Sequence, residues 1–208
     1  MKAGHLEILV EEPSMEAFLL GILPKLLGKQ TSFQIYPFQG KDDLLNKLPA
    51  RLRGYAAWLP ATMRLVVLVD RDDDDCARLK GRIEKIGEEA GLQGKKEGGQ
   101  RQWQIVTRIA IEELEAWYFG DWDAVRSLYP KVKKTVAKVA RYRDSDAISG
   151  GTWEAFERLL QKAGYFKNGL RKIEVDRALG REFKPSQNRS PSFQVFCRAL
   201  LEAVESTE

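Results

Sequence analysis

Acidic side chains gather at two places in the sequence, each directly after a short apolar run. The first cluster, EEPSME at residues 11–16, follows LEILV, and the second, DRDDDD at 70–75, follows RLVVLV. Functional groups of open parallel sheets lie at the carboxyl ends of the strands, so neighbouring strands would bring both clusters together. Crowded carboxylates repel one another unless a cation lies among them, and oxygen ligands favour Mg²⁺ or Mn²⁺. The pattern therefore predicts a divalent metal site where Glu11, Asp70 and Asp72 converge.

The individual acids differ in how strongly their positions indicate a ligand. Asp70 ends its strand, and Asp72, two residues further on an extended segment, could reach the same ion or a second one. The acids at 73–75 also fit the first turn of a helix, where they favour the helix dipole, although Asp74 stays a candidate ligand. Glu16 fits either a ligand or a first-turn helix acid, and Glu115 follows a later strand with its role open.

The composition excludes several other kinds of chemistry. The chain has 208 residues with one His, His5, and two Cys, too few for a His/Cys zinc site or a disulfide framework. A serine or cysteine relay would need His5 as its base, and the sequence has no Gly-x-Ser-x-Gly motif. There is no apolar run of membrane length and no signal-peptide pattern, so we expect a cytoplasmic protein without a membrane partner.

The first half alternates segments typical of strands and helices. Strands are expected at 6–10, 33–38, 64–69 and 103–111, and RLVVLV has the continuous apolar character of a central parallel strand. Helices are expected after Ser14 as N-cap, after Asp42 or Asp43, and over 73–90. This order predicts an α/β fold with a parallel sheet and helices on both faces.

The second half reads as a helical extension. We expect a 1–120 α/β domain followed by helices near 122–129, 131–140, 152–163, 171–179 and 193–204, the last capped by Ser190 with Pro191 in its first turn. Residues 121–208 carry 17 Lys and Arg against 12 Asp and Glu. This basic surface either meets phosphates or is an ordinary solvated face. The candidate phosphate contacts are Arg71, Lys131, Lys133, Lys134 and Arg189.

A Glu closing the first strand and Asp-x-Asp closing a later apolar strand resemble the Toprim domain of topoisomerases, bacterial primases and overcoming-lysogenization-type nucleases. The matching residues are Glu11, Asp70 and Asp72. More narrowly, EEPSMEAFL, VDRDDDDC, IEELEAWYFGD and NRSPSFQVF look like a bacterial family of small stand-alone Toprim-like proteins. Members of that family are catalogued mostly as of unknown function and suspected of roles in phage defence beside an ATPase. One departure is Glu12, since a Toprim domain has Gly after its Glu.

The resemblance implies a Rossmann-like Toprim fold and Mg²⁺-dependent chemistry on phosphodiesters, with Glu11 as general acid or base and Asp70 and Asp72 holding metal. Of the Toprim activities, a nuclease requires the fewest additional parts beside a carboxylate–metal centre. A Toprim-type nuclease with nucleic acid as its partner is therefore the leading hypothesis. The alternatives are an inactive Toprim scaffold that regulates an ATPase, and a receiver-like phosphoacceptor domain that uses Glu11, Glu12 and Asp70. A receiver also needs a Lys after a fifth strand, which the sequence lacks. A homo-oligomer is compatible with each hypothesis.

Overall fold

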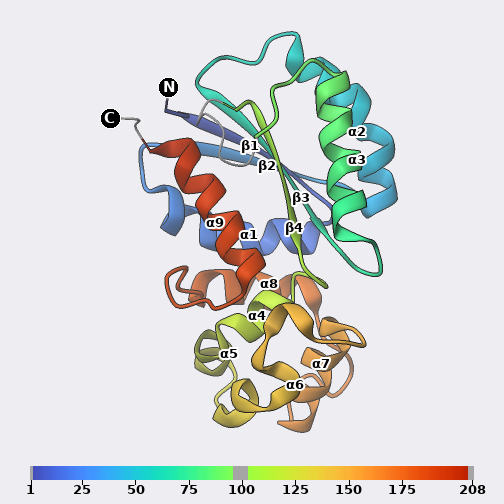
Figure 1. The fold of residues 1–208 in the computed structure, drawn as a ribbon. Helices are drawn as coiled ribbons and strands as arrows, with labels where there is room; N and C mark the ends of the chain where they lie inside the picture. Colours follow the sequence, from blue (N-terminus) through green and yellow to red (C-terminus); the bar gives the residue numbers. More distant parts are fainter. Residues whose placement is uncertain (1, 96–102, 206–208) are drawn as a thin grey trace.

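Four parallel strands form the centre of the protein, in the order β2-β1-β3-β4. The computed structural model describes residues 2–95 and 103–205 (Figure 1). The strands are β1 (His5–Val10), β2 (Ser32–Pro37), β3 (Met63–Asp70) and β4 (Ile105–Ala110). Ile8 of β1 pairs with Ile35 and Val66 on either side. All four expected strands are confirmed, with ends shifted by a few residues, and RLVVLV lies in the interior of the sheet.

Helices cover both faces of the sheet, as the α/β pattern predicts. Alternate strand side chains point to opposite faces. Ile8, Val66 and Leu68 pack with α1 (Pro13–Leu27) and α9 (Pro191–Val204) in one cluster. Leu9 and Val67 pack with α2 (Lys41–Ala56) and α3 (Cys76–Glu89) on the other face. Figure 1 shows α9 lying along the sheet although it is the last element of the chain. The expected α/β class is therefore confirmed.

Two of the predicted helix starts are wrong. At α1 the N-cap residue is Glu12 and Pro13 occupies the first turn, so the Ser14 hydroxyl donates to the Glu12 carboxylate instead of capping the backbone. At α2 the N-cap residue is Gly40, at φ 99°, and no side chain caps the helix. By contrast, Ser190 accepts a hydrogen bond from the Phe193 N–H and Pro191 starts α9, as predicted.

Short helices fill the segment between β4 and α9. These are α4 (Ala116–Gly120), α5 (Trp122–Leu128), the 3-10 turn η1 (Lys134–Lys138), α6 (Ala140–Arg143), the 3-10 turn η2 (Ser145–Ala147), α7 (Thr152–Lys162) and α8 (Lys172–Glu182). The helix expected over 131–140 is wrong, since only η1 forms there. Lys133 has an extended backbone, and its carbonyl accepts both the Trp122 indole N–H at 3.1 Å and the Val136 N–H of the 3-10 turn at 3.3 Å.

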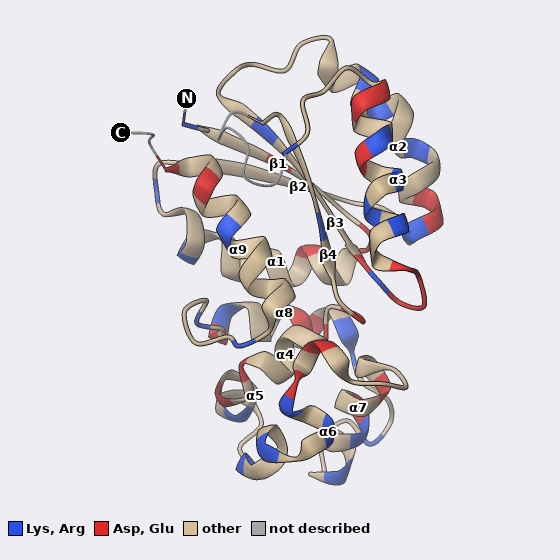
Figure 2. Ribbon diagram, viewed as in Figure 1, with Lys and Arg blue, Asp and Glu red and all other residues tan. Residues whose placement is uncertain are grey.

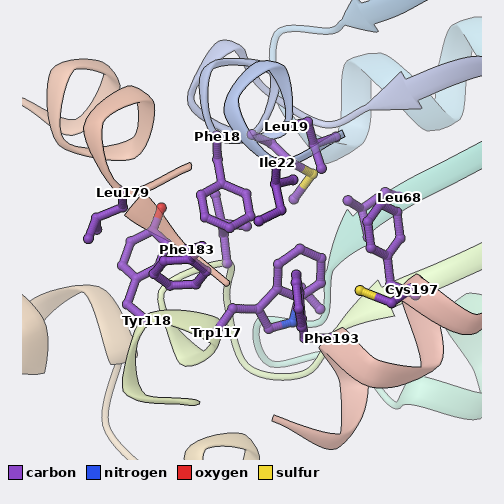
Figure 3. Close-up of a cluster of buried hydrophobic side chains, with 14 of the residues drawn as sticks. Phe18, Leu19, Ile22, Leu68, Trp117, Tyr118, Leu179, Phe183, Phe193 and Cys197 are labelled. Carbon is purple, nitrogen blue, oxygen red and sulfur yellow. The ribbon is translucent and has the colours of Figure 1, made fainter. Parts of the chain in front are cut away.

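An aromatic core joins these helices to the sheet layer. Phe18 of α1 lies 5.9 Å from Trp117 and 5.1 Å from Phe183, measured between ring centroids (Figure 3). Helix α8 crosses α1 with backbones in contact, because a Cβ on Gly180 would lie 2.1 Å from the Phe18 carbonyl oxygen. The core is therefore continuous from the sheet into the helical part. The domain boundary expected at residue 120 stays a prediction.

Within the described ranges, no helix combines the length and apolar character needed to span a membrane.

Candidate functional site

Three carboxylates lie at the carboxyl ends of adjacent strands. Glu11 directly follows β1, Asp70 is the last residue of β3, and Glu115 follows β4 at the start of α4. Because β1, β3 and β4 are neighbours in the sheet, these ends meet at one edge. The sequence predicted the convergence of Glu11 with Asp70, and a contact between them confirms it: the Asp70 backbone N–H donates to Glu11 Oε2 at 3.1 Å.

Burial makes the Glu11 carboxyl a weaker acid than an exposed glutamate. The pKa of Glu11 is raised from its ordinary 4.5 to about 7, chiefly by removal from water and also by the negative charge of Asp72. The hydrogen bond from the Asp70 N–H opposes this shift without cancelling it. A carboxyl with a pKa near neutrality can both accept and release a proton at physiological pH.

Asp70 and Glu115 have buried carboxylate oxygens without hydrogen-bond partners among the described residues. Their exposed fractions are 4% and 0%. No described residue donates to Asp70 Oδ1 or to either carboxylate oxygen of Glu115. Burial raises the pKa of Asp70, and the charges of Glu115 and Glu11 raise it further. Burial also raises the pKa of Glu115, to about 7. Buried oxygens without donors are costly, and a bound cation would remove that cost.

A lysine from α8 faces this carboxylate group. Lys172 Nζ lies 2.5 Å from Glu12 Oε1 and 3.5 Å from Glu115 Oε1. Burial disfavours its charge, but the two carboxylates outweigh burial and raise the pKa of Lys172. For Glu115 the balance is reversed, since the cost of burial exceeds the attraction of Lys172. The charged ammonium therefore neutralises part of the cluster.

Asp176 lies one helical turn after Lys172 and extends the buried acidic group. Its Oδ1 accepts the Tyr118 hydroxyl at 2.7 Å, whereas no described residue donates to its Oδ2. Burial and the charge of Glu115 raise the pKa of Asp176. Sequence reasoning missed both α8 residues. Their spacing of four places a cation and an acid on one helix face, but no sequence signal indicates that this face meets Glu115.

The Asp72 side chain does not lie with Asp70 on one strand face, whereas the sequence predicted that both would converge on one site. The strand ends at Asp70, and Asp72 has a left-handed backbone with φ 49°, so the two side chains do not continue on one strand face. Asp72 and Asp74 instead accept from Lys41 Nζ, at 2.7 and 2.8 Å, with exposed fractions of 47% and 50%. Together with Lys41 they form a second, more exposed acidic group.

The remaining acids of the predicted clusters have other surroundings. Glu16 lies half-buried in the first turn of α1, and no described side chain pairs with it. Glu112 pairs with Arg71, and Glu113 accepts from the Thr152 hydroxyl and the Trp153 N–H at the start of α7. Asp75 caps α3 by accepting the Arg78 N–H, which fits the helix-start reading of this acidic run.

The carboxylate oxygens of this site are the kind of donor that a divalent ion prefers, although the side chains are not arranged as ligands around one point. Among residues 2–95 and 103–205, no group of three or more His, Cys, Asp or Glu side chains has an arrangement that could hold a metal. The unpartnered oxygens of Asp70 and Glu115 are nevertheless hard anionic donors of the kind that Mg²⁺ takes. Binding would require the side chains to turn toward a common point.

Two of the five predicted phosphate contacts come together. Lys134 and Arg189 line one pocket in the helical part, whereas Arg71 is held by Glu112. Lys133 is exposed beside that pocket, and Lys131 lies 5.8 Å from the centre of the Tyr165 ring. Figure 2 shows blue Lys and Arg segments around α5 and α6 and red segments where the strands end near α1 and α8.

Comparison with known proteins assigns the chain to a family. No curated protein and no solved structure matches it. One family model, Domain of unknown function (DUF4276), matches residues 10–201 and so covers β2, β3 and β4, the carboxylates and the helical part. The chain therefore belongs to the DUF4276 family.

Proposed function

We propose that this protein is a Mg²⁺-dependent, Toprim-like nuclease that cleaves phosphodiester bonds of nucleic acid in the cytoplasm. The observation that carries the proposal is the meeting of Glu11, Asp70 and Glu115 at the ends of three adjacent strands, with buried oxygens that have no described donor. The resemblance of Glu11 and Asp70 to Toprim residues supports the same chemistry. Both cysteines are free, as in proteins of a reducing compartment.

Each buried carboxylate has a role in this proposal. Asp70 and Glu115 hold the ion, and Glu11, with its pKa near 7, transfers a proton as general acid or base. Bound Mg²⁺ supplies charge stabilisation at the phosphoryl group and lowers the pKa of bound water. For Asp72 or Asp74 to act as a ligand, its carboxylate must first leave Lys41. Glu16, in the first turn of α1, stays a candidate ligand that no described contact joins to these carboxylates.

A catalytically inactive scaffold that regulates a partner ATPase is the second candidate, and Lys172 favours it. The ammonium of Lys172 lies between Glu12 and Glu115, where it offsets their charge without a metal. A site neutralised from within can be stable as a structural element. The receiver alternative gains no support, because Asp70 is only 4% exposed and the described sheet ends at β4.

The decisive experiment compares Glu11→Gln with a matched control, Glu88→Gln. Gln keeps the shape of Glu11 and its ability to accept the Asp70 N–H, but it cannot transfer a proton. We expect Mn²⁺ affinity within about tenfold of wild type, with cleavage lowered by ~10²–10⁴, the usual weight of general acid–base catalysis. Glu88 is exposed on α3, so Glu88→Gln should leave both unchanged. Calorimetric Mn²⁺ titration and plasmid and RNA cleavage assays measure the two effects.

The outcomes separate the roles. Loss of Mn²⁺ binding in Glu11→Gln would make Glu11 a ligand, and unaltered cleavage would remove it from the mechanism. No cleavage by the wild type, with candidate ATPase partners added, would favour the scaffold.

A further inference from the structure

A pocket of about 390 Å³ lies in the helical part and shares no lining residue with the carboxylate site. Its volume falls within the range of small-ligand sites in proteins. Helices α4 and α5, the turn η1, helix α6 and the loop before α9 all contribute to its walls. Since these segments come from different parts of the chain, the pocket exists only in the folded protein.

Four cationic side chains from three segments line this pocket. Lys134 and Lys138 belong to η1, Arg143 ends α6, and Arg189 precedes α9. Within the described residues, none of the four forms an ion pair or a side-chain hydrogen bond, whereas Lys41 and Lys172 elsewhere are both paired. Like charges that converge without partners repel, and an anion placed among them removes that repulsion.

The two acids that line the pocket do not neutralise it. Asp121 is buried, and its carboxylate accepts the backbone N–H groups of Ala124 and Lys184 at 3.2 and 3.1 Å. Asp123 is exposed and pairs with none of the lining cations in the described structure. Formal charges of the lining residues therefore favour a ligand that is more than singly negative.

The fold fixes the walls that carry these cations. Phe119 stacks between Trp122 and Tyr142, with ring centroids 5.4 and 5.1 Å apart and planes 17° from parallel in both pairs. The Arg189 N–H donates to the Gly120 carbonyl at 2.9 Å, next to Asn188, whose amide donates to the Trp117 carbonyl at 2.9 Å. The backbone beside each wall is therefore held before a ligand arrives, which lowers the entropic cost of binding.

From this geometry we propose that the pocket binds a phosphate monoester, carried by a free nucleotide or by the phosphorylated end of a nucleic-acid strand. A phosphate monoester carries about −1.5 to −2 charges at pH 7, which suits four cations better than a single carboxylate does. Arg143 and Arg189 can each present a planar pair of donors to its oxygens, and Lys134 and Lys138 add compact charges. The proposal uses none of the metal-site residues, so it stands whether or not the protein is a nuclease.

Binding measured without metal tests the proposal. Calorimetry in EDTA and 0.1 M NaCl compares AMP with adenosine, and a 5′-phosphorylated tetranucleotide with its 5′-hydroxyl form. The variant Lys134→Gln/Arg189→Gln removes two lining cations. The control, Arg53→Gln/Arg198→Gln, removes two exposed cations outside the pocket, on α2 and α9, and changes the net charge equally.

We expect both phosphorylated probes to bind and both unphosphorylated probes to bind at least roughly tenfold more weakly, since charge-assisted hydrogen bonds dominate the contact. Lys134→Gln/Arg189→Gln should weaken AMP roughly tenfold or more. The control should stay within about threefold of wild type, because salt screens distant charges. Lys138→Gln, from the same wall, should weaken AMP in the same direction. Tighter binding of the phosphorylated tetranucleotide than of AMP would support a strand end, and equal binding a free nucleotide.

Three results would overturn the proposal. These are equal losses in the two double variants, adenosine binding as tightly as AMP, and no binding of either phosphorylated probe. Circular dichroism of the double variants checks that both are folded, as expected for exposed side chains without partners.

Discussion

Raising the pH should destabilise the metal-free protein, because the buried carboxyls of the site resist ionisation. The pKa of Glu11 and that of Glu115 are each about 7 in the folded protein, against an ordinary value of 4.5. A raised pKa in the folded state means that the folded protein holds its proton more tightly than the unfolded chain does. The resulting stabilisation is fully present below pH 4.5 and is lost as the pH rises through 7.

The size of the effect follows from the shifts. Each of the two groups shifts by 7 − 4.5 = 2.5 pKa units. At 1.36 kcal/mol per unit, each contributes a loss of about 3 kcal/mol to the free energy of unfolding between pH 4.5 and pH 8. Asp70, whose pKa is also raised by burial and by the charges of Glu115 and Glu11, acts in the same direction. Mg²⁺ that binds only the folded protein restores about 2.7 kcal/mol at a concentration of 100 Kd.

Replacing one acid tests the cause. In Asp70→Asn the amide keeps the shape of the side chain but removes a like charge from Glu11 and Glu115. We expect a smaller loss of stability between pH 5 and pH 8, by roughly 1 kcal/mol or more, and a much weaker response to Mg²⁺. Urea unfolding in EDTA and in Mg²⁺, at both pH values, measures each quantity. Asp73→Asn is the control, since Asp73 is exposed in the following loop and should behave as wild type.

The reasoning fails if Asp70→Asn unfolds the protein, because Asp70 would then be a structural residue. It also fails if Mg²⁺ stabilises Asp70→Asn and wild type equally, because the ion would then bind elsewhere.

Two further variants probe the elements around the site. Lys172→Gln leaves Glu115 buried without its nearest cation, so we expect the free energy of unfolding in urea at pH 8 to fall by about 3–5 kcal/mol. Mg²⁺ should recover most of this loss if the ion takes the place of the ammonium. An unchanged stability would show that the pair contributes nothing. Gly180→Ala forces the α1–α8 crossing apart and should lower the free energy of unfolding by several times ~1 kcal/mol. Gly54→Ala, with open space around its Cβ in helix α2, should instead raise it by ~1 kcal/mol. Equal effects of the two substitutions would contradict the close backbone contact.

Much of the sheet layer was predictable because its signals are local. RLVVLV is apolar on both faces, so it belongs in the interior of a parallel sheet, and the chain order of strands and helices fixes the α/β class. Ser190 and Pro191 are a helix start that depends only on neighbouring backbone groups, and the prediction is confirmed. The helix expected over 131–140 was wrong: Lys133 has an extended backbone, and its carbonyl accepts a tertiary hydrogen bond from the Trp122 indole beside the Val136 N–H of a 3-10 turn.

The sequence by itself determined that Glu11 and Asp70 end parallel strands, since strand ends follow from local apolar patterning. Only the tertiary structure decided their surroundings. Strand order brings Glu115 to the same edge, and the crossing of α8 over α1 carries Lys172 to Glu12, a residue 160 positions away. The left-handed turn at Asp72 moves that carboxylate toward Lys41 instead. Charges and burial depend on neighbours in space, and for these groups the neighbours come from distant segments that no local pattern brings together.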